Sequence, residues 1–284
     1  MDKIEVERKI AEAANYLREG NAERAELWMT RLLAEDVDLS GAERAYLRGQ
    51  ATELMARAQF AMKHYEEAMG TFVSAAQEIQ NWLTSQQFES EDSGKQKNGE
   101  MLAGILQNLC FAYLEKKRMA EAENTGLEAI AVARQYASPD SLILARTLFG
   151  VSIVWYRKGD YAYAQKMLEE ALKIFRKQDE MKMAAFCLNN LGRISEELGD
   201  KEQGVSLHRQ AVALRRQLPD KLDLAFSLGN LGVALANMEN WQEAEDSLAE
   251  AISIYKKEGK ESMPEYAGFL KNLEICHNFL QGKK

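Results

Sequence analysis

Small and apolar residues recur along this 284-residue chain with a period of about 40 residues. Residues 188–192 read Leu-Asn-Asn-Leu-Gly and residues 228–232 read Leu-Gly-Asn-Leu-Gly, at an offset of 40. Extending this alignment in both directions defines an anchor column, Ala13, Ala56, Cys110, Ser152, Gly192, Gly232 and Glu274. Repetition at this spacing predicts an array of similar supersecondary units.

Two further columns of mostly small residues follow the anchors at fixed distances. Twelve residues after each anchor come Ala25, Ala68, Ala122, Ala164, Gly204 and Ala244. Nineteen residues after each anchor come Leu32, Ala75, Ala129, Ala171, Ala211 and Ala251. Two helices approach closely only where side chains are short, so the columns predict a pair of contacting helices in each unit.

Turn signals fall where this register requires them. Seven residues after their anchors come glycines that can end a first helix, Gly20, Gly159 and Gly199. Each is followed by a residue that can cap the second helix, Asn21, Asp160 and Asp200. Just after the cap position come aromatic residues that can pack back and fix the angle of the pair, Tyr65, Tyr161 and Trp241.

Composition supports an all-helical chain. Apolar residues make up 46% and charged residues 28%, which is typical of a folded protein, and the three prolines all fall between units. We therefore expect an all-α fold in one array over residues 1–284. Its six helix pairs are expected at about 6–40, 48–83, 101–137, 143–179, 183–218 and 223–259, followed by a capping helix at 264–281.

One step of the repeat is too long. Ala56 and Cys110 are 54 residues apart, whereas the later steps are 40 to 42. The excess falls in residues 84–100, which are rich in Gln, Ser, Glu, Lys and Gly and lack periodicity. We expect a flexible loop there; the alternative is that the preceding helix extends past Trp82 and breaks at Gly94.

The motif L-x-x-L-G, followed by Gly-Asp or Gly-Asn and two alanine columns, resembles the tetratricopeptide repeat over essentially the whole chain. The long period and the repeated Asn-Leu-Gly are similar to kinesin light chains, Pins-type polarity adaptors and Rap-type peptide receptors. Leucine stands where many members have tryptophan, at Leu106, Leu148, Leu188, Leu228 and Leu270. The resemblance implies a right-handed superhelical solenoid whose first helices line a concave, partner-binding groove.

Residues two positions before the anchors are then expected to line that groove, and four of them are asparagines. Asparagine can pair with the backbone of an extended peptide, and arginine on the same face can pair with carboxylates. The expected peptide-binding residues are Asn108, Arg146, Asn189, Asn190, Arg193, Asn230 and Asn272. Arg57, Phe111 and Glu115 share the face. The alternative is that the asparagines bridge neighbouring helices and the arginines are solvated, an alternative that is favoured for Arg57.

Charge and chemistry narrow the function. The net charge of −8 disfavours nucleic acid and anionic membrane surfaces as partners. No signal-peptide core or stretch of about 20 apolar residues occurs, so a cytoplasmic location is expected. Three scattered cysteines without a C-x-x-C pair suggest neither disulfides nor zinc. Glycine-rich phosphate loops and converging catalytic groups are missing, and we expect no cofactor and no enzymatic activity.

The sequence thus predicts an adaptor that holds a protein or peptide segment with acidic and apolar side chains. Two alternatives remain open. One is structural self-assembly into a homo-oligomer, because the motifs of the first two units are degenerate. The other is a peptide-switched regulator similar to the bacterial peptide receptors.

Overall fold

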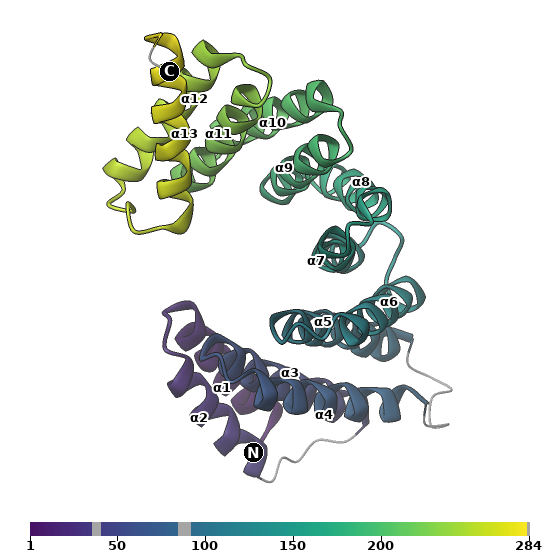
Figure 1. The fold of residues 1–284 in the computed structure, drawn as a ribbon. Helices are drawn as coiled ribbons and strands as arrows, with labels where there is room; N and C mark the ends of the chain where they lie inside the picture. Colours follow the sequence, from purple (N-terminus) through teal and green to yellow (C-terminus); the bar gives the residue numbers. More distant parts are fainter. Residues whose placement is uncertain (36–40, 85–91, 283–284) are drawn as a thin grey trace. The chain divides into compact units, whose positions relative to one another are not determined.

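The computed structural model describes residues 1–35, 41–84 and 92–282, which form helices and contain no strand (Figure 1). The chain forms two compact units, Met1–Trp155 and Tyr156–Lys284, and the boundary falls within α7. The helices are α1 Lys3–Arg18, α2 Ala22–Ala34, α3 Gly41–Ala61, α4 Tyr65–Thr84, α5 Asp92–Glu115, α6 Met119–Tyr136, α7 Leu142–Lys158, α8 Tyr161–Lys177, α9 Met181–Glu197, α10 Lys201–Arg216, α11 Lys221–Ala236, α12 Trp241–Lys257 and α13 Pro264–Leu280.

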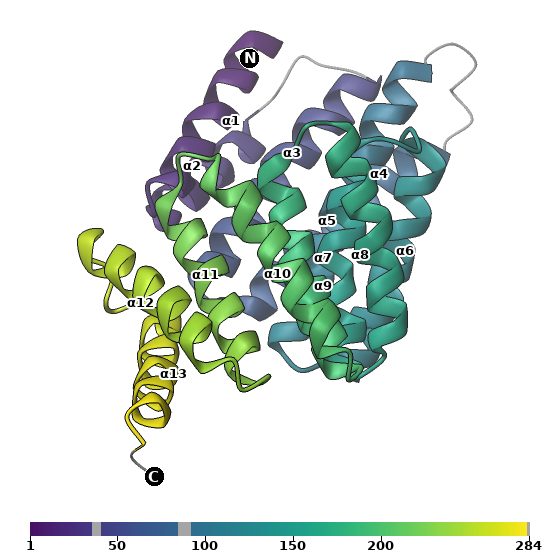
Figure 2. The same cartoon turned by 90° about the horizontal axis from the view of Figure 1, so that it is seen from above.

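Within each unit, consecutive helices pack against one another (Figures 1 and 2). In the first unit this holds from α1 to α6, and the first helices α1, α3 and α5 also touch their nearest counterparts. In the second unit it holds from α8 to α13, and α11 contacts both α9 and α13. The prediction of an all-α fold of stacked helix pairs is confirmed, whereas one continuous array over residues 1–284 stays a prediction.

The small-residue columns lie at the helix contacts, as the sequence predicted. Every residue of the two alanine-rich columns is buried, and so are all the anchors except Glu274 on α13, which faces solvent. At Gly232 a Cβ atom would lie 2.5 Å from Leu248 Cγ and 3.1 Å from the Ala244 carbonyl oxygen. The first and second helices of this pair therefore meet at a distance that only a residue without a side chain permits.

The expected caps are present. Gly20, Gly159 and Gly199 adopt left-handed φ values of 80°, 81° and 89°. The following side chains accept backbone N–H groups at the start of the second helix, at 3.2 Å for Asn21, 3.1 Å for Asp160 and 2.9 Å for Asp200. Other pairs make the same turn without glycine, and Lys63, Lys117 and Glu239 take φ values of 64°, 59° and 60°.

The aromatic residues at the start of the second helices behave in two ways. Tyr65 and Tyr161 pack back onto their own first helix, with ring centroids 5.1 Å from Phe60 and 5.5 Å from Tyr156. Trp241 instead stacks on Phe279 of α13, at 4.2 Å and an interplanar angle of 2°. The last aromatic residue therefore joins the final pair to the capping helix.

The prediction of a flexible loop over residues 84–100 is wrong for residues 92–100, which are helical. Thr84 ends α4, and α5 begins at Asp92 and continues through Gly94 and Gly99; residues 85–91 lie outside the described residues. Packing explains this extension. The Lys97 ammonium lies 4.0 Å from the centre of the Tyr46 ring, and a Cβ atom at Gly99 would lie 2.1 Å from Tyr136 Cγ. These tertiary contacts outweigh the poor helix propensity of the segment.

The start of α11 is tied to α9 by charge. Asp220 accepts the Asp223 N–H at 3.1 Å, and Lys182 Nζ lies 3.1 Å from Asp220 Oδ2 and 2.8 Å from Asp223 Oδ2. The Asp223 backbone N–H and then Lys182 hold the pKa of the Asp220 carboxyl below its usual value. An ionised Asp220 therefore stabilises the N-terminus of α11.

Substituting alanine at Gly232 tests the close approach in the sixth pair. We expect Gly232→Ala to lower the free energy of unfolding by about 1–3 kcal/mol, because the new methyl group displaces Leu248. Gly268→Ala on exposed α13, where a Cβ atom meets nothing within 4 Å, is the matched control and should stabilise by about 0.5–1 kcal/mol. Urea unfolding measures the free energy of unfolding of both variants. Equal changes in the two variants would show that the site at Gly232 is not tightly packed.

Acid titration tests the Asp220 interaction. Because the folded-state pKa lies below the unfolded one, its stabilisation is complete above about pH 5 and is lost progressively as the pH falls further. Asp220→Asn keeps a capping oxygen but removes the charge, so its unfolding free energy should fall less between pH 5 and pH 2. The difference is at most about 1 kcal/mol, since the pair is half exposed. Parallel acid slopes for both proteins would refute the assignment.

Candidate functional site

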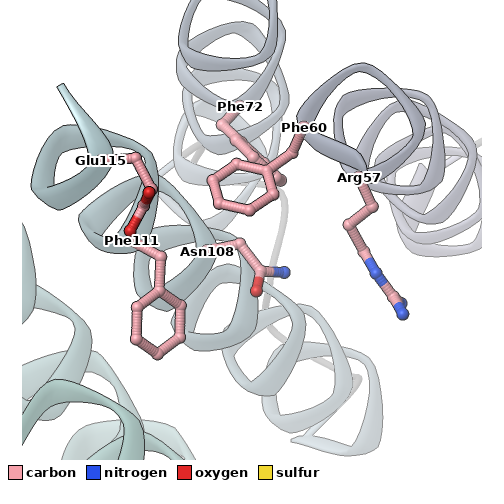
Figure 3. Close-up of a pocket in the computed structure, with 6 residues that line it drawn as sticks. All are labelled: Arg57, Phe60, Phe72, Asn108, Phe111 and Glu115. Atoms are coloured by element: carbon pink, nitrogen blue, oxygen red, sulfur yellow. The ribbon is translucent and has the colours of Figure 1, made fainter. Parts of the chain in front are cut away.

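A hollow of about 340 Å³ in the first unit lies among α3, α4 and α5 (Figure 3). Phe60, the buried Phe72 and the half-buried Phe111 give it aromatic walls. Its polar lining residues are Arg57 on α3 and Asn108 and Glu115 on α5. Four residues of the face expected from the sequence thus line one hollow: Arg57, Asn108, Phe111 and Glu115. Arg57 is among them, although the sequence favoured the alternative that its side chain is merely solvated.

Asn108 is oriented by a neighbouring carboxylate. Its Nδ2 donates to Glu53 Oε1 at 3.0 Å, and Arg57 Nη1 lies 3.9 Å from the same oxygen. Burial raises the pKa of Glu53, while Arg57 and the Asn108 hydrogen bond act in the opposite direction. In Figure 3 the Asn108 side chain lies on the same side of the hollow as the Phe60 and Phe111 rings, with its amide toward Arg57. The amide is therefore held in place beside an apolar surface.

Arg57 also lines a second hollow, of about 470 Å³, between α1 and α3. Ala14, Leu17, Leu54 and Ala61 form its apolar lining, and Arg18 is its second cation. The side chain of Arg57 is 53% exposed, so its guanidinium reaches solvent between the two hollows. An apolar side chain fits either hollow, and a carboxylate can pair with the arginine at the rim.

Three of the predicted asparagines occupy equivalent positions on contacting first helices of the second unit. Asn190 on α9, Asn230 on α11 and Asn272 on α13 are each half-buried. Asn272 Nδ2 donates within its own helix to the Gly268 carbonyl oxygen at 2.9 Å. Asn230 Nδ2 is buried and has no hydrogen-bond partner among the residues that the structure describes. Asn230 thus has hydrogen-bonding capacity that its own unit does not use.

The prediction for Asn189 is wrong. Asn189 is only 2% exposed, its Nδ2 donates to Ser227 Oγ at 2.8 Å, and its Oδ1 lies 3.2 Å from His208 Nδ1. It therefore bridges α9, α10 and α11 and cannot face a bound segment. The reason is the helical angle of about 100° per residue, which separates Asn189 from its neighbour Asn190.

The two predicted arginines have different surroundings. Arg193 is exposed on α9, where its Nη2 donates to Tyr156 Oη at 3.0 Å and its guanidinium lies 5.0 Å from the ring centre. Tyr156 Oη also lies 3.5 Å from Glu197 Oε1. Arg146 is exposed on α7 and does not line the hollow of Figure 3. Arg193 is thus held by an aromatic neighbour on the first-helix face of the second unit.

Sequence reasoning missed the burial of His208. The ring is 1% exposed, and its Nε2 lies 3.0 Å from Glu196 Oε1. Gly192 makes room for it, because a Cβ atom there would lie 2.7 Å from the ring. The sequence predicted a small residue at this anchor. The repeat pattern did not reveal that Gly192 faces the imidazole of His208, whereas Gly232 faces the alkyl side chain of Leu248.

The cysteines are poor nucleophiles. All three are buried, and burial raises the pKa of the Cys110 and Cys187 thiols to about 12. They are therefore protonated at neutral pH. Across the described ranges, no group of three or more His, Cys, Asp and Glu residues is placed to hold a metal ion. None of the described helices is long and apolar enough to cross a membrane.

Solved structures with the same fold come from several repeat proteins. BtubC (BKLC) from P. vanneervenii is 21% identical over 89% of this chain and 92% of its own, with a TM-score of 0.67. A putative kinesin light chain from Podosopora anserina is 17% identical over 76% and 98%, with a TM-score of 0.60. A Rap protein complexed with Competence and Sporulation Factor is 15% identical over 99% and 73%, with a TM-score of 0.59. At these identities the likeness establishes the fold alone.

Sequence comparison adds the family. No curated protein matches the chain. The family model described as "Tetratricopeptide repeat" matches residues 102–177 and 184–257, which together exceed half of the chain. These segments contain most of each helix from α5 to α12, with the buried alanine columns of those pairs, and the chain therefore belongs to the tetratricopeptide repeat family.

Proposed function

We propose that this protein is a non-enzymatic adaptor that binds a protein or peptide segment along the exposed side of its first helices. The observation that carries the proposal is the hollow of Figure 3, where an oriented amide and an arginine stand beside three phenylalanines. A pocket that combines apolar walls with a few placed polar groups suits recognition of a side chain and its backbone. Interaction with proteins is also what the repeat family suggests.

The partner segment carries apolar and acidic side chains. An apolar side chain fills the hollow beside Phe60 and Phe111, and a carboxylate pairs with Arg57 at its rim. In the second unit Asn190, Asn230 and Arg193 offer the same combination of amide and guanidinium groups. Arg146 and Asn272 extend the proposed face, and the cytoplasm is the proposed location. Support comes by analogy from the Rap structure, which holds the Competence and Sporulation Factor.

Self-association is the second candidate, favoured by one observation. Ile275, Phe279 and Leu280 on α13 are 38%, 58% and 42% exposed. Ile275 and Phe279 lie one turn apart on one face of the last helix, where they would be covered by another chain. Sedimentation of the purified protein over a range of concentrations separates this candidate from binding of a different partner.

Partner binding is tested with two first-helix variants, one in each unit. Arg57→Ala with Asn108→Ala alters the first unit, and Asn190→Ala with Arg193→Ala and Asn230→Ala alters the second. Arg209→Ala with Arg216→Ala, on the exposed side of α10, is the control, because each arginine forms its ion pair with an acidic residue of α12. Circular dichroism first establishes equal helix content in all four proteins.

A partner captured from cytosol by the unaltered protein is then purified and its Kd measured with each variant. We expect each first-helix variant to weaken binding about tenfold or more, since buried polar contacts at an interface centre dominate affinity. The α10 control should bind like the unaltered protein. Equal affinity for all variants, or capture of nothing but the protein itself, would exclude the proposed binding face.

A further inference from the structure

Arg215 occupies a core position of the repeat. It lies 23 residues after its anchor, Gly192, and the equivalent residues of four other units are buried and apolar or aromatic, Ile79, Ala133, Phe175 and Tyr255. Arg215 is itself 0% exposed. A guanidinium is therefore buried on α10 where four other pairs bury only hydrocarbon or a phenol, and burial of a charge is costly unless it is fully paired.

One nitrogen of this guanidinium has a partner. Arg215 Nη1 donates to Asp223 Oδ2 at 2.5 Å, and the guanidinium carbon lies 4.1 Å from the centre of the Phe186 ring. Burial lowers the pKa of Arg215, while Asp223 and Asp220 raise it. Asp223 does not depend on Arg215, because Lys182 Nζ already lies 2.8 Å from the same oxygen. The charge of Asp223 is thus already balanced by Lys182, and pairing with Asp223 does not by itself explain why an arginine is buried here.

The other edge of the guanidinium is unused. Nε and Nη2 are both buried and have no hydrogen-bond partner among the described residues. In the planar guanidinium these two nitrogens lie on the same edge, and their N–H bonds point outward in the same direction. Two adjacent oxygens of a carboxylate or phosphate match that edge with two hydrogen bonds. Leaving both donors unpaired in the interior is unfavourable, so the edge has a strong affinity for such a group.

Phe186 on α9 packs against the Arg215 guanidinium. Its ring covers one face of the guanidinium, yet the residue is only half-buried. Phe186 lies on α9 one turn before Asn190, on the face that holds the predicted binding residues. Rotation of this aromatic side chain would therefore uncover one face of the Arg215 guanidinium toward that side of α9.

We infer that the Nε and Nη2 edge of Arg215 is a binding site for an oxyanion, reached by displacement of the Phe186 ring. The ligand presents two oxygens side by side, as a carboxylate or a phosphate group does. The site is a property of the second unit and does not depend on the proposed partner, because small anions alone can be used to detect it.

The first test observes Arg215 directly by nuclear magnetic resonance in the full-length protein. The Nε–H signal of Arg215, assigned by its loss in Arg215→Lys, is followed during titration with inorganic phosphate and, separately, sodium acetate. Sodium chloride holds the ionic strength constant. We expect a saturable shift of this signal with one or both anions. A response to acetate alone identifies a carboxylate site, and a response to phosphate identifies a phosphate site.

The second test uses Arg215→Met, with Arg216→Met on the exposed side of α10 as the matched control. Arg215→Met should fold, because the position is apolar elsewhere in the repeat and Asp223 keeps Lys182. Millimolar phosphate or acetate, whichever shifts the signal, should raise the Tm of the unaltered protein and of Arg216→Met but not that of Arg215→Met. Phe186→Ala should lower the apparent Kd for that anion about tenfold, because the closed state is removed.

Two results would overturn the inference. One is an Arg215 Nε–H signal that responds to neither anion. The other is an equal Tm increase in Arg215→Met and the unaltered protein, which would reflect general salt effects on the surface. In either case Arg215 is a structural ion pair with Asp223 and nothing more.

Discussion

Close approach between helices is the constraint on which the rest of this structure depends. At the anchors of the six pairs and twelve residues after them, the side chains are alanine, glycine, serine or cysteine, because larger ones hold the helices apart. Gly204 shows how tight the crossing is, since a Cβ atom there would lie 3.1 Å from the carbonyl oxygen of Gly192. Such crossings fix where each first helix lies, and hence where its exposed side chains are presented. The position of the hollow beside Asn108 is therefore set by the close contacts between helix backbones at these crossings.

In the second unit, buried polar side chains also take part in the packing between helices. His208 and Arg215 are seven residues apart on α10, and both stand where other pairs have mostly aliphatic or aromatic side chains. His208 faces Glu196 of α9 and Arg215 faces Asp223 of α11. Helix α10 is thus joined to each neighbour by directional contacts as well as by dispersion. Buried polar contacts tolerate displacement poorly, so they specify the alignment of the three helices more narrowly than alkyl packing does.

The repeat columns and caps could be predicted from sequence because they depend on local chemistry: small residues for contact, left-handed glycines for turns and short polar side chains for caps. Asn189 could not be separated from Asn190 on composition, since only the rotation of α9 decides which one meets Ser227. The environments of His208 and Arg215 depend on residues of other helices that the period does not reveal. The pocket role of Arg57 likewise depends on three phenylalanines contributed by separate helices.

Helix α5 has one feature whose effect reaches beyond its own pair. It is 24 residues long, against 16 to 17 for α7, α9 and α11, and its added turns are packed on Tyr46 and Tyr136. In a solenoid, stability is approximately a sum of intrinsic repeat energies and nearest-neighbour couplings, so a longer contact makes one coupling stronger than the rest. Amide protons of α5 and α6 should therefore be the slowest to exchange in the first unit. Local unfolding that begins in α1 to α4 would therefore stop at this reinforced junction.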